Sequence, residues 1–145
     1  MNGHSGDTRG TATVEMALTL PILILIVLGS TDLGRLFYDA VAVSNAARAG
    51  LSYGSLDEGK AGDSAKISLV ASDDAQYVGG ISVTSERICE CADGSVVNCE
   101  SGSCTEGAPK MYVKVTATKT WDTLLPYPGI PSSVPLTREA YMRAR

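Results

Sequence analysis

The feature that most limits the fold of this chain is an apolar segment close to its N-terminus. Residues 11–31 contain one charged side chain, Glu15, and residues 16–31 contain none. In a helix the segment rises about 32 Å, which matches the roughly 30 Å hydrocarbon core of a bilayer. The segment therefore predicts an N-terminal helix inserted in a membrane.

The composition of the chain argues against several classes of function. The 145 residues include 12 basic and 16 acidic side chains, with a net charge of −4 and no basic stripe, so we expect no nucleic-acid binding. The single histidine is His4, and no recognised catalytic triad or carboxylate pair is present, so we expect no enzymatic activity. No cofactor and no metal ion are expected either.

Three interpretations of the apolar segment differ in how they treat Glu15. A secretory signal peptide over residues 1–31 needs a small-residue cleavage site after the apolar run, and Gly29-Ser30-Thr31 is a poor one. A plain membrane anchor leaves unexplained a carboxylate that is costly to place inside the bilayer. In the third interpretation the acid has a functional partner in the membrane.

The residues around Glu15 resemble a type IV prepilin processing site, in which a polar leader ends in a glycine, here Gly10, and the acid lies five residues later. Further matches resemble the TadE-like proteins, minor pseudopilins of the tight-adherence (Flp) pilus machinery. These matches are Arg9-Gly10, Val14-Glu15-Met16-Ala17-Leu18, Pro21, Gly29, Asp32-Leu33-Gly34-Arg35 and Ala46-Ala47-Arg48-Ala49-Gly50. Met16 stands where the family usually has an aromatic residue, and Asp32 where it usually has Glu.

The resemblance implies a leader over residues 1–10 that a prepilin peptidase removes by cutting between Gly10 and Thr11. Glu15 would then attract the new α-amino group of a neighbouring subunit, because opposite charges about 4 Å apart in a poor dielectric attract strongly. The implied protein is a single-pass component of the bacterial inner membrane, with a cytoplasmic N-terminus and a periplasmic head. It would act in pilus biogenesis, initiation and surface adherence.

The implied partners are the peptidase, other pilins or pseudopilins, the pilus assembly platform and membrane lipid. Two alternatives remain open at this stage. One is a disulfide-stapled binding domain that is secreted or anchored through residues 1–31. The other is a pseudopilin of a type II-like secretion system, which shares the processing site.

The helical pattern continues beyond the apolar segment, giving a predicted assembly helix over residues 11–54. Pro21 would kink or loosen its membrane part.

One stripe of residues recurs at alternating spacings of four and three: Leu33, Phe37, Ala40, Ser44, Ala47 and Leu51. The pattern places four charged residues off this stripe: Asp32, Arg35, Asp39 and Arg48. Small residues four apart, such as Gly50 and Gly54, would let another helix approach closely. The stripe packs either on the chain's own head or on other subunits.

A linker is predicted over residues 55–63, followed by a head over residues 64–145 with a short helix at 64–71. Strands are predicted at 81–91, 112–121 and 134–142.

In the second strand Val113, Val115, Ala117 and Trp121 share one face, which Lys119 interrupts. The third strand has its own apolar face: Val134, Leu136, Ala140 and Met142. Residues 124–135 contain four prolines and predict a rigid loop, with Tyr127 as a candidate contact residue. A long helix on three antiparallel strands is an α+β, pilin-like fold.

The four cysteines all lie in the predicted head, at Cys89, Cys91, Cys99 and Cys104. Their spacing fits a four-cysteine zinc site only loosely, because such a site usually has two C-x2-4-C knuckles. A head outside the cytoplasm, as the resemblance implies, favours two disulfides, which require an oxidising compartment. Cys89 and Cys91 point to the same face of a strand, so they do not pair with each other. Two pairings remain open: 89–99 with 91–104, or 89–104 with 91–99.

Overall fold

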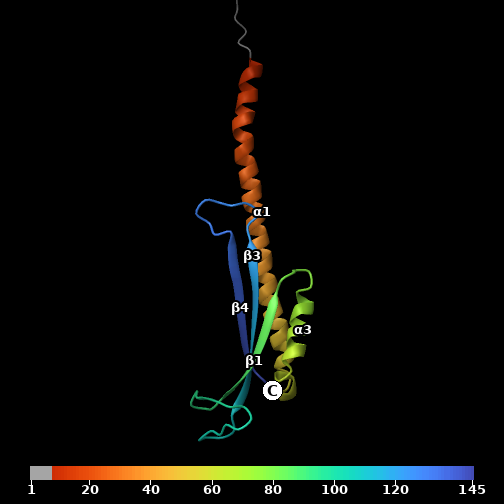
Figure 1. The fold of residues 1–145 in the computed structure, drawn as a ribbon, viewed down its shortest axis with the longest axis vertical. Coiled ribbons are helices and arrows are strands. Elements are labelled where there is room, and N and C mark those ends of the chain that lie inside the picture. Colours follow the sequence, from red (N-terminus) through yellow and green to blue (C-terminus); the bar gives the residue numbers. More distant parts are fainter. Residues whose placement is uncertain (1–7) are drawn as a thin grey trace, which may run out of the picture. The chain divides into compact units, whose positions relative to one another are not determined.

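The structure is a computed structural model that describes residues 8–145 (Figure 1). Most of the predicted leader, residues 1–7 with His4, lies outside the described residues. The elements are α1 (Thr8–Gly54), α2 (Glu58–Ala61), α3 (Ser64–Asp74), β1 (Ser82–Glu90), β2 (Val96–Val97), β3 (Lys110–Asp122) and β4 (Ser133–Arg143). A long apolar helix followed by a small antiparallel sheet confirms the predicted α+β class.

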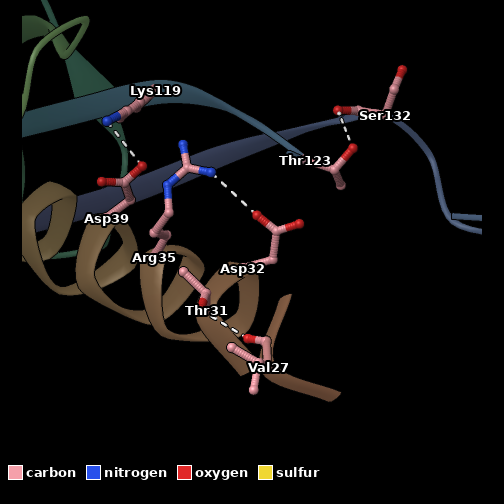
Figure 2. Close-up of polar contacts among 8 residues, drawn as sticks. All are labelled: Val27, Thr31, Asp32, Arg35, Asp39, Lys119, Thr123 and Ser132. Carbon is pink, nitrogen blue, oxygen red and sulfur yellow. Dashed lines mark hydrogen bonds and ion pairs between the residues drawn. The ribbon is translucent and has the colours of Figure 1, made fainter. Parts of the chain in front are cut away.

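The chain divides into two compact units, and the first ends at Leu36. By length and composition the helix Ala12–Gly54 is able to cross a membrane, and its most apolar window is not buried in the structure. Hydroxyl groups within the first unit are satisfied by the helix itself. Ser30 Oγ donates to Ile26 O at 2.7 Å. Thr31 Oγ1 donates to Val27 O at 2.8 Å (Figure 2). Such internal bonds remove the need for water around a hydroxyl group.

The second unit, Phe37–Arg145, contains a four-stranded antiparallel sheet in the order β2-β1-β3-β4. The central strand β3 has the alternation predicted for it, because Val113, Val115 and Ala117 are fully buried. Strand β4 begins at Ser133, so Pro135 lies inside a strand and not in the preceding loop. Proline lacks the N–H that a ladder requires, and β4 tolerates it because it lies at the edge of the sheet.

The core forms where the C-terminal part of α1 and the helix α3 pack on one face of the sheet. Val43, Ala46 and Ala47 of α1 cluster with Ala71 of α3 and Ala117 of β3. A second cluster of buried residues in the same elements includes Leu51, Ile67, Val113 and Val115. The chain's own head therefore covers the buried side of α1 over residues 43–54.

Gly50 and Gly54 lie where α1 meets α3 and β3. A Cβ atom at Gly54 would lie 2.9 Å from Ile67 Cδ1 and 3.1 Å from Val113 Cγ1. A Cβ atom at Gly50 would lie 3.2 Å from the Ala71 Cβ atom. The small residues that predict close helix approach thus admit α3 of the same chain.

We expect Gly54→Ala to lower the free energy of unfolding of the second unit by about 1–2 kcal/mol. The added methyl group overpacks a fully buried site, and this outweighs the roughly 1 kcal/mol that alanine gains over glycine in a helix. Urea denaturation in detergent micelles measures the change. Gly79→Ala is the matched control, because no atom lies within 4 Å of a Cβ there. Equal stability of the two variants would contradict the prediction.

Three elements were not predicted in full. The predicted linker contains the four-residue helix α2, whose N-cap is Asp57. Helix α3 continues to Asp74, three residues beyond its predicted end. The two-residue strand β2 pairs with β1 through Cys89–Val97 and Glu90–Val96. Each is too short, or too near a helix end, for hydrophobic periodicity to detect.

Candidate functional site

The predicted processing site lies in the first turns of α1, which begins at Thr8. Gly10 is exposed, and no atom lies within 4 Å of a Cβ built on it. Within the residues that the structure describes, nothing packs against the backbone at this position. Cleavage between Gly10 and Thr11 remains a prediction.

Glu15 is exposed on α1, two turns after the helix begins. Its neighbours along the helix are apolar and also exposed, with Val14 at 61%, Met16 at 65% and Leu18 at 67%. A carboxylate surrounded by uncovered apolar side chains is poorly matched to lipid unless an opposite charge reaches it. Pro21 follows inside the same helix, where it removes one backbone hydrogen-bond donor.

The residues predicted to pack along α1 fall into two groups. Ala47 and Leu51 are buried in the head and Ala40 is half-buried. Leu33 and Phe37 are exposed, at 52% and 63%, so within this chain they are not packing residues. Their contact with other helices remains a prediction.

The buried side of α1 is rotated from the predicted stripe, and Asp39 lies on it. The expectation that Asp39 lies off the packing face is wrong, because its side chain is only 13% exposed. Asp32 was also expected off the stripe, yet its side chain is 5% exposed and its Oδ1 lies 3.1 Å from Arg35 Nη1. Val43, one turn after Asp39, is fully buried and was not predicted.

Lys119, the interruption in the apolar face of β3, is explained by Asp39. The Lys119 Nζ atom lies 2.9 Å from Asp39 Oδ2, and only 15% of the lysine side chain is exposed (Figure 2). The pair joins α1 to β3 within the second unit. A buried ion pair adds little net stability, but it leaves a costly unpaired charge when either partner is displaced. It therefore favours one register of the helix on the sheet.

Two disulfides hold the segment between β1 and β3. Cys89 pairs with Cys99 and Cys91 pairs with Cys104, with Cα atoms 5.1 and 5.6 Å apart. This is the first of the two pairings left open by the sequence. Cys89 lies in β1 and Cys91 directly follows the strand, and both are buried. No group of three or more potential metal ligands occurs in the described part of the chain.

The far end of the sheet carries local polar contacts that shift two pKa values. The Ser95 hydroxyl donates to Asp93 Oδ1 at 2.7 Å and lowers the pKa of Asp93. Burial raises the pKa of Tyr141, and its hydrogen bond to Glu90 Oε2 at 3.2 Å acts in the same direction. The Tyr141 ring also stacks on Tyr112 with centroids 5.0 Å apart. The contacts of Tyr141 connect β4 to β1 and β3 at the surface of the head.

Met142 was predicted on the apolar face of the last strand but is 51% exposed. It lines an open groove of about 700 Å³ between α1 and β4, together with Leu51 and Leu56. Met142 keeps the predicted face, because its register partner in β3 is the buried Val113. It is exposed because β4 is the edge strand, and its last residues extend beyond the cover that α1 provides.

Comparison with known proteins bears on α1 alone. A family model described as TadE-like protein matches residues 10–51, from the predicted cleavage site almost to the end of α1 at Gly54. The match confirms the resemblance to TadE-like proteins over this segment, and it indicates involvement in a function related to the Tad pilus. No curated protein matches the chain, and no solved structure matches it.

Proposed function

We propose that this chain is a pseudopilin-like, non-enzymatic membrane component of a tight-adherence (Flp) pilus assembly system. A prepilin peptidase cuts it after Gly10, and the mature chain acts in pilus initiation and biogenesis, and through these in surface adherence. Its partners are the peptidase, other pilins or pseudopilins, and the assembly platform. The TadE-like match over residues 10–51 and the long apolar helix support this proposal.

Glu15 is the observation that carries the proposal. Cleavage after Gly10 makes it the fifth residue of the mature chain and leaves a free α-amino group on Thr11. The exposed carboxylate lies among exposed apolar side chains, and in lipid it needs a cation to balance its charge. The α-amino group of a neighbouring subunit would supply one in a poor dielectric, where the attraction is strongest.

The head supports a location outside the cytoplasm. Two disulfides form and persist in oxidising compartments such as the periplasm. With the head in the periplasm, α1 crosses the inner membrane once and its N-terminus is cytoplasmic, where the leader meets the peptidase.

The N-terminal sequence and intact mass of the membrane-extracted protein test the processing step. A mature chain that starts at Thr11 supports the proposal. A start near Asp32 would instead favour the secreted domain with a discarded signal peptide, and an uncut chain would leave only a membrane anchor. Processing at Thr11 in cells that lack a Tad system but contain a type II-like secretion system would favour the second alternative.

Replacement of Glu15 tests the role of the carboxylate. We expect Glu15→Ala to be processed normally and to abolish pilus assembly, because the α-amino group of the neighbour then lacks its counter-charge. Glu15→Asp keeps the charge and should retain part of the assembly. The matched control is Thr19→Ala, a polar position one turn further along the exposed helix. Pilus counts by electron microscopy measure the effect, and wild-type counts for Glu15→Ala would refute the pairing role.

A further inference from the structure

The loop between β3 and β4 is an apolar feature of the second unit that the proposed function does not use. It spans residues 123–132, at the end of the sheet where β3 stops and β4 begins (Figure 1). No charged residue occurs from Thr123 to Thr137. Its three large aliphatic side chains are exposed: Leu124 at 50%, Leu125 at 38% and Ile130 at 55%. An uncharged loop with exposed leucine and isoleucine is unusual on a surface that faces only water.

The loop is held in one conformation by its own contacts. At its base, the Thr123 N–H donates to Ser132 O at 3.0 Å, and the Thr123 hydroxyl points to the same oxygen (Figure 2). At its tip, the Ile130 N–H donates to Tyr127 O at 3.2 Å across a β-turn. Pro128 and Gly129 occupy the central positions, and Gly129 has φ +83°, as a type II turn requires. The exposed side chains are therefore displayed on a rigid support.

The contacts of β3 with α1 show which end of the second unit carries the loop. Gly54 lies beside Val113, whereas Asp39 pairs with Lys119. Strand β3 is therefore antiparallel to α1. The loop follows the C-terminal end of β3, so it lies at the end of the sheet where α1 enters the second unit. The part of α1 at this end of the second unit is also the part closest in sequence to the apolar segment.

Chain lengths place the loop within reach of a membrane surface. The apolar segment ends at Thr31, and the eight helical residues from there to Asp39 rise about 12 Å. The four residues from Lys119 to Thr123 extend a strand by about 13 Å. These two short stretches limit how far the loop can lie from the end of the apolar segment, because the Asp39–Lys119 pair joins them.

We propose that this loop inserts into the interface of the lipid bilayer that α1 crosses, as a second and shallow membrane contact. The inference rests on the proposed membrane insertion of α1. The side chains of Leu124, Leu125 and Ile130 would enter the boundary between headgroups and acyl chains. Pro126, Pro128 and Pro131 have no N–H group, so fewer backbone donors lose water on insertion.

The experiment uses tryptophan substitutions in the full chain, reconstituted in phosphatidylcholine vesicles. Leu125→Trp and Ile130→Trp place a fluorophore in the loop, and Val96→Trp places one at a 71% exposed site in β2. Strand β2 pairs with β1 beside the start of β3, at the opposite end of that strand. The native Trp121 is common to all variants and is subtracted. Lipids that carry a nitroxide on the headgroup report shallow insertion.

We expect the headgroup nitroxide to quench both loop variants about twofold more than Val96→Trp, with a blue-shifted emission. Equal quenching of the loop and β2 variants would overturn the proposal. Ile24→Trp, tested with a nitroxide deep in the acyl chains, reports the insertion of α1 separately. Quenching of Ile24→Trp without quenching of the loop rejects this inference alone. Absence of quenching at both sites rejects membrane insertion, and with it the proposed function.

Discussion

Removal of both disulfides is expected to lower the free energy of unfolding of the second unit by about 4–5 kcal/mol. Each bond closes a loop of about 10–15 residues, which in the chain-entropy model is worth about 3 kcal/mol. The loops overlap, because Cys91 lies between Cys89 and Cys99, so the sum is less than twice the single value. Thermal unfolding in detergent micelles, with and without reductant, measures the loss.

Paired substitutions separate the two bonds. Cys89→Ala with Cys99→Ala should cost about half of the total and leave one intact disulfide, which peptide mapping without reductant would find between Cys91 and Cys104. Mapping of the wild-type chain should find 89–99 and 91–104. Four free thiols, bound zinc, or the pairing 89–104 with 91–99 would contradict the structure, and the first two would also remove the support for a periplasmic head.

The parts of the fold that the sequence predicts are those with one dominant pattern. The apolar segment is recognisable because a single charge interrupts it, and β3 because Val113, Val115 and Ala117 alternate with polar residues. The buried side of α1 was misplaced because small residues on both sides of the helix allow two stripes with the same spacing. The correct stripe includes Asp39, and a charged residue is expected on the solvent side of a helix unless its partner is known.

The details of the candidate site depended on long-range contacts. Lys119 is recognisable from the sequence as an anomaly, but its partner lies 80 positions earlier in the chain. The disulfide pairing was open because Cys89 and Cys91 face the same way, so local geometry admits either partner for each. Gly10 and Glu15 were identified by resemblance, and the match to the family model confirms the segment in which they lie.

Replacement of Asp39 by alanine is expected to destabilise the second unit by about 3 kcal/mol. The change removes the carboxylate that lies 2.9 Å from Lys119 Nζ. The lysine side chain, which is only 15% exposed, then carries an unpaired charge on the apolar face of β3. Breaking one side of a buried pair costs about 3–5 kcal/mol, and the residual exposure of this pair places it at the lower limit. Denaturation in detergent micelles measures the loss.

The double variant Asp39→Leu with Lys119→Met tests whether the loss comes from an unpaired charge. Because apolar side chains of similar volume replace both charges, its stability should lie within about 1 kcal/mol of the wild type. Glu139→Ala is the matched control, since it breaks a 3.0 Å ion pair with Lys114 on the opposite, exposed face of the same strand. That change should cost less than about 1 kcal/mol. If Glu139→Ala were as damaging as Asp39→Ala, burial would not be the reason, and the Asp39–Lys119 pair would have no special part in setting the register of α1 on the sheet.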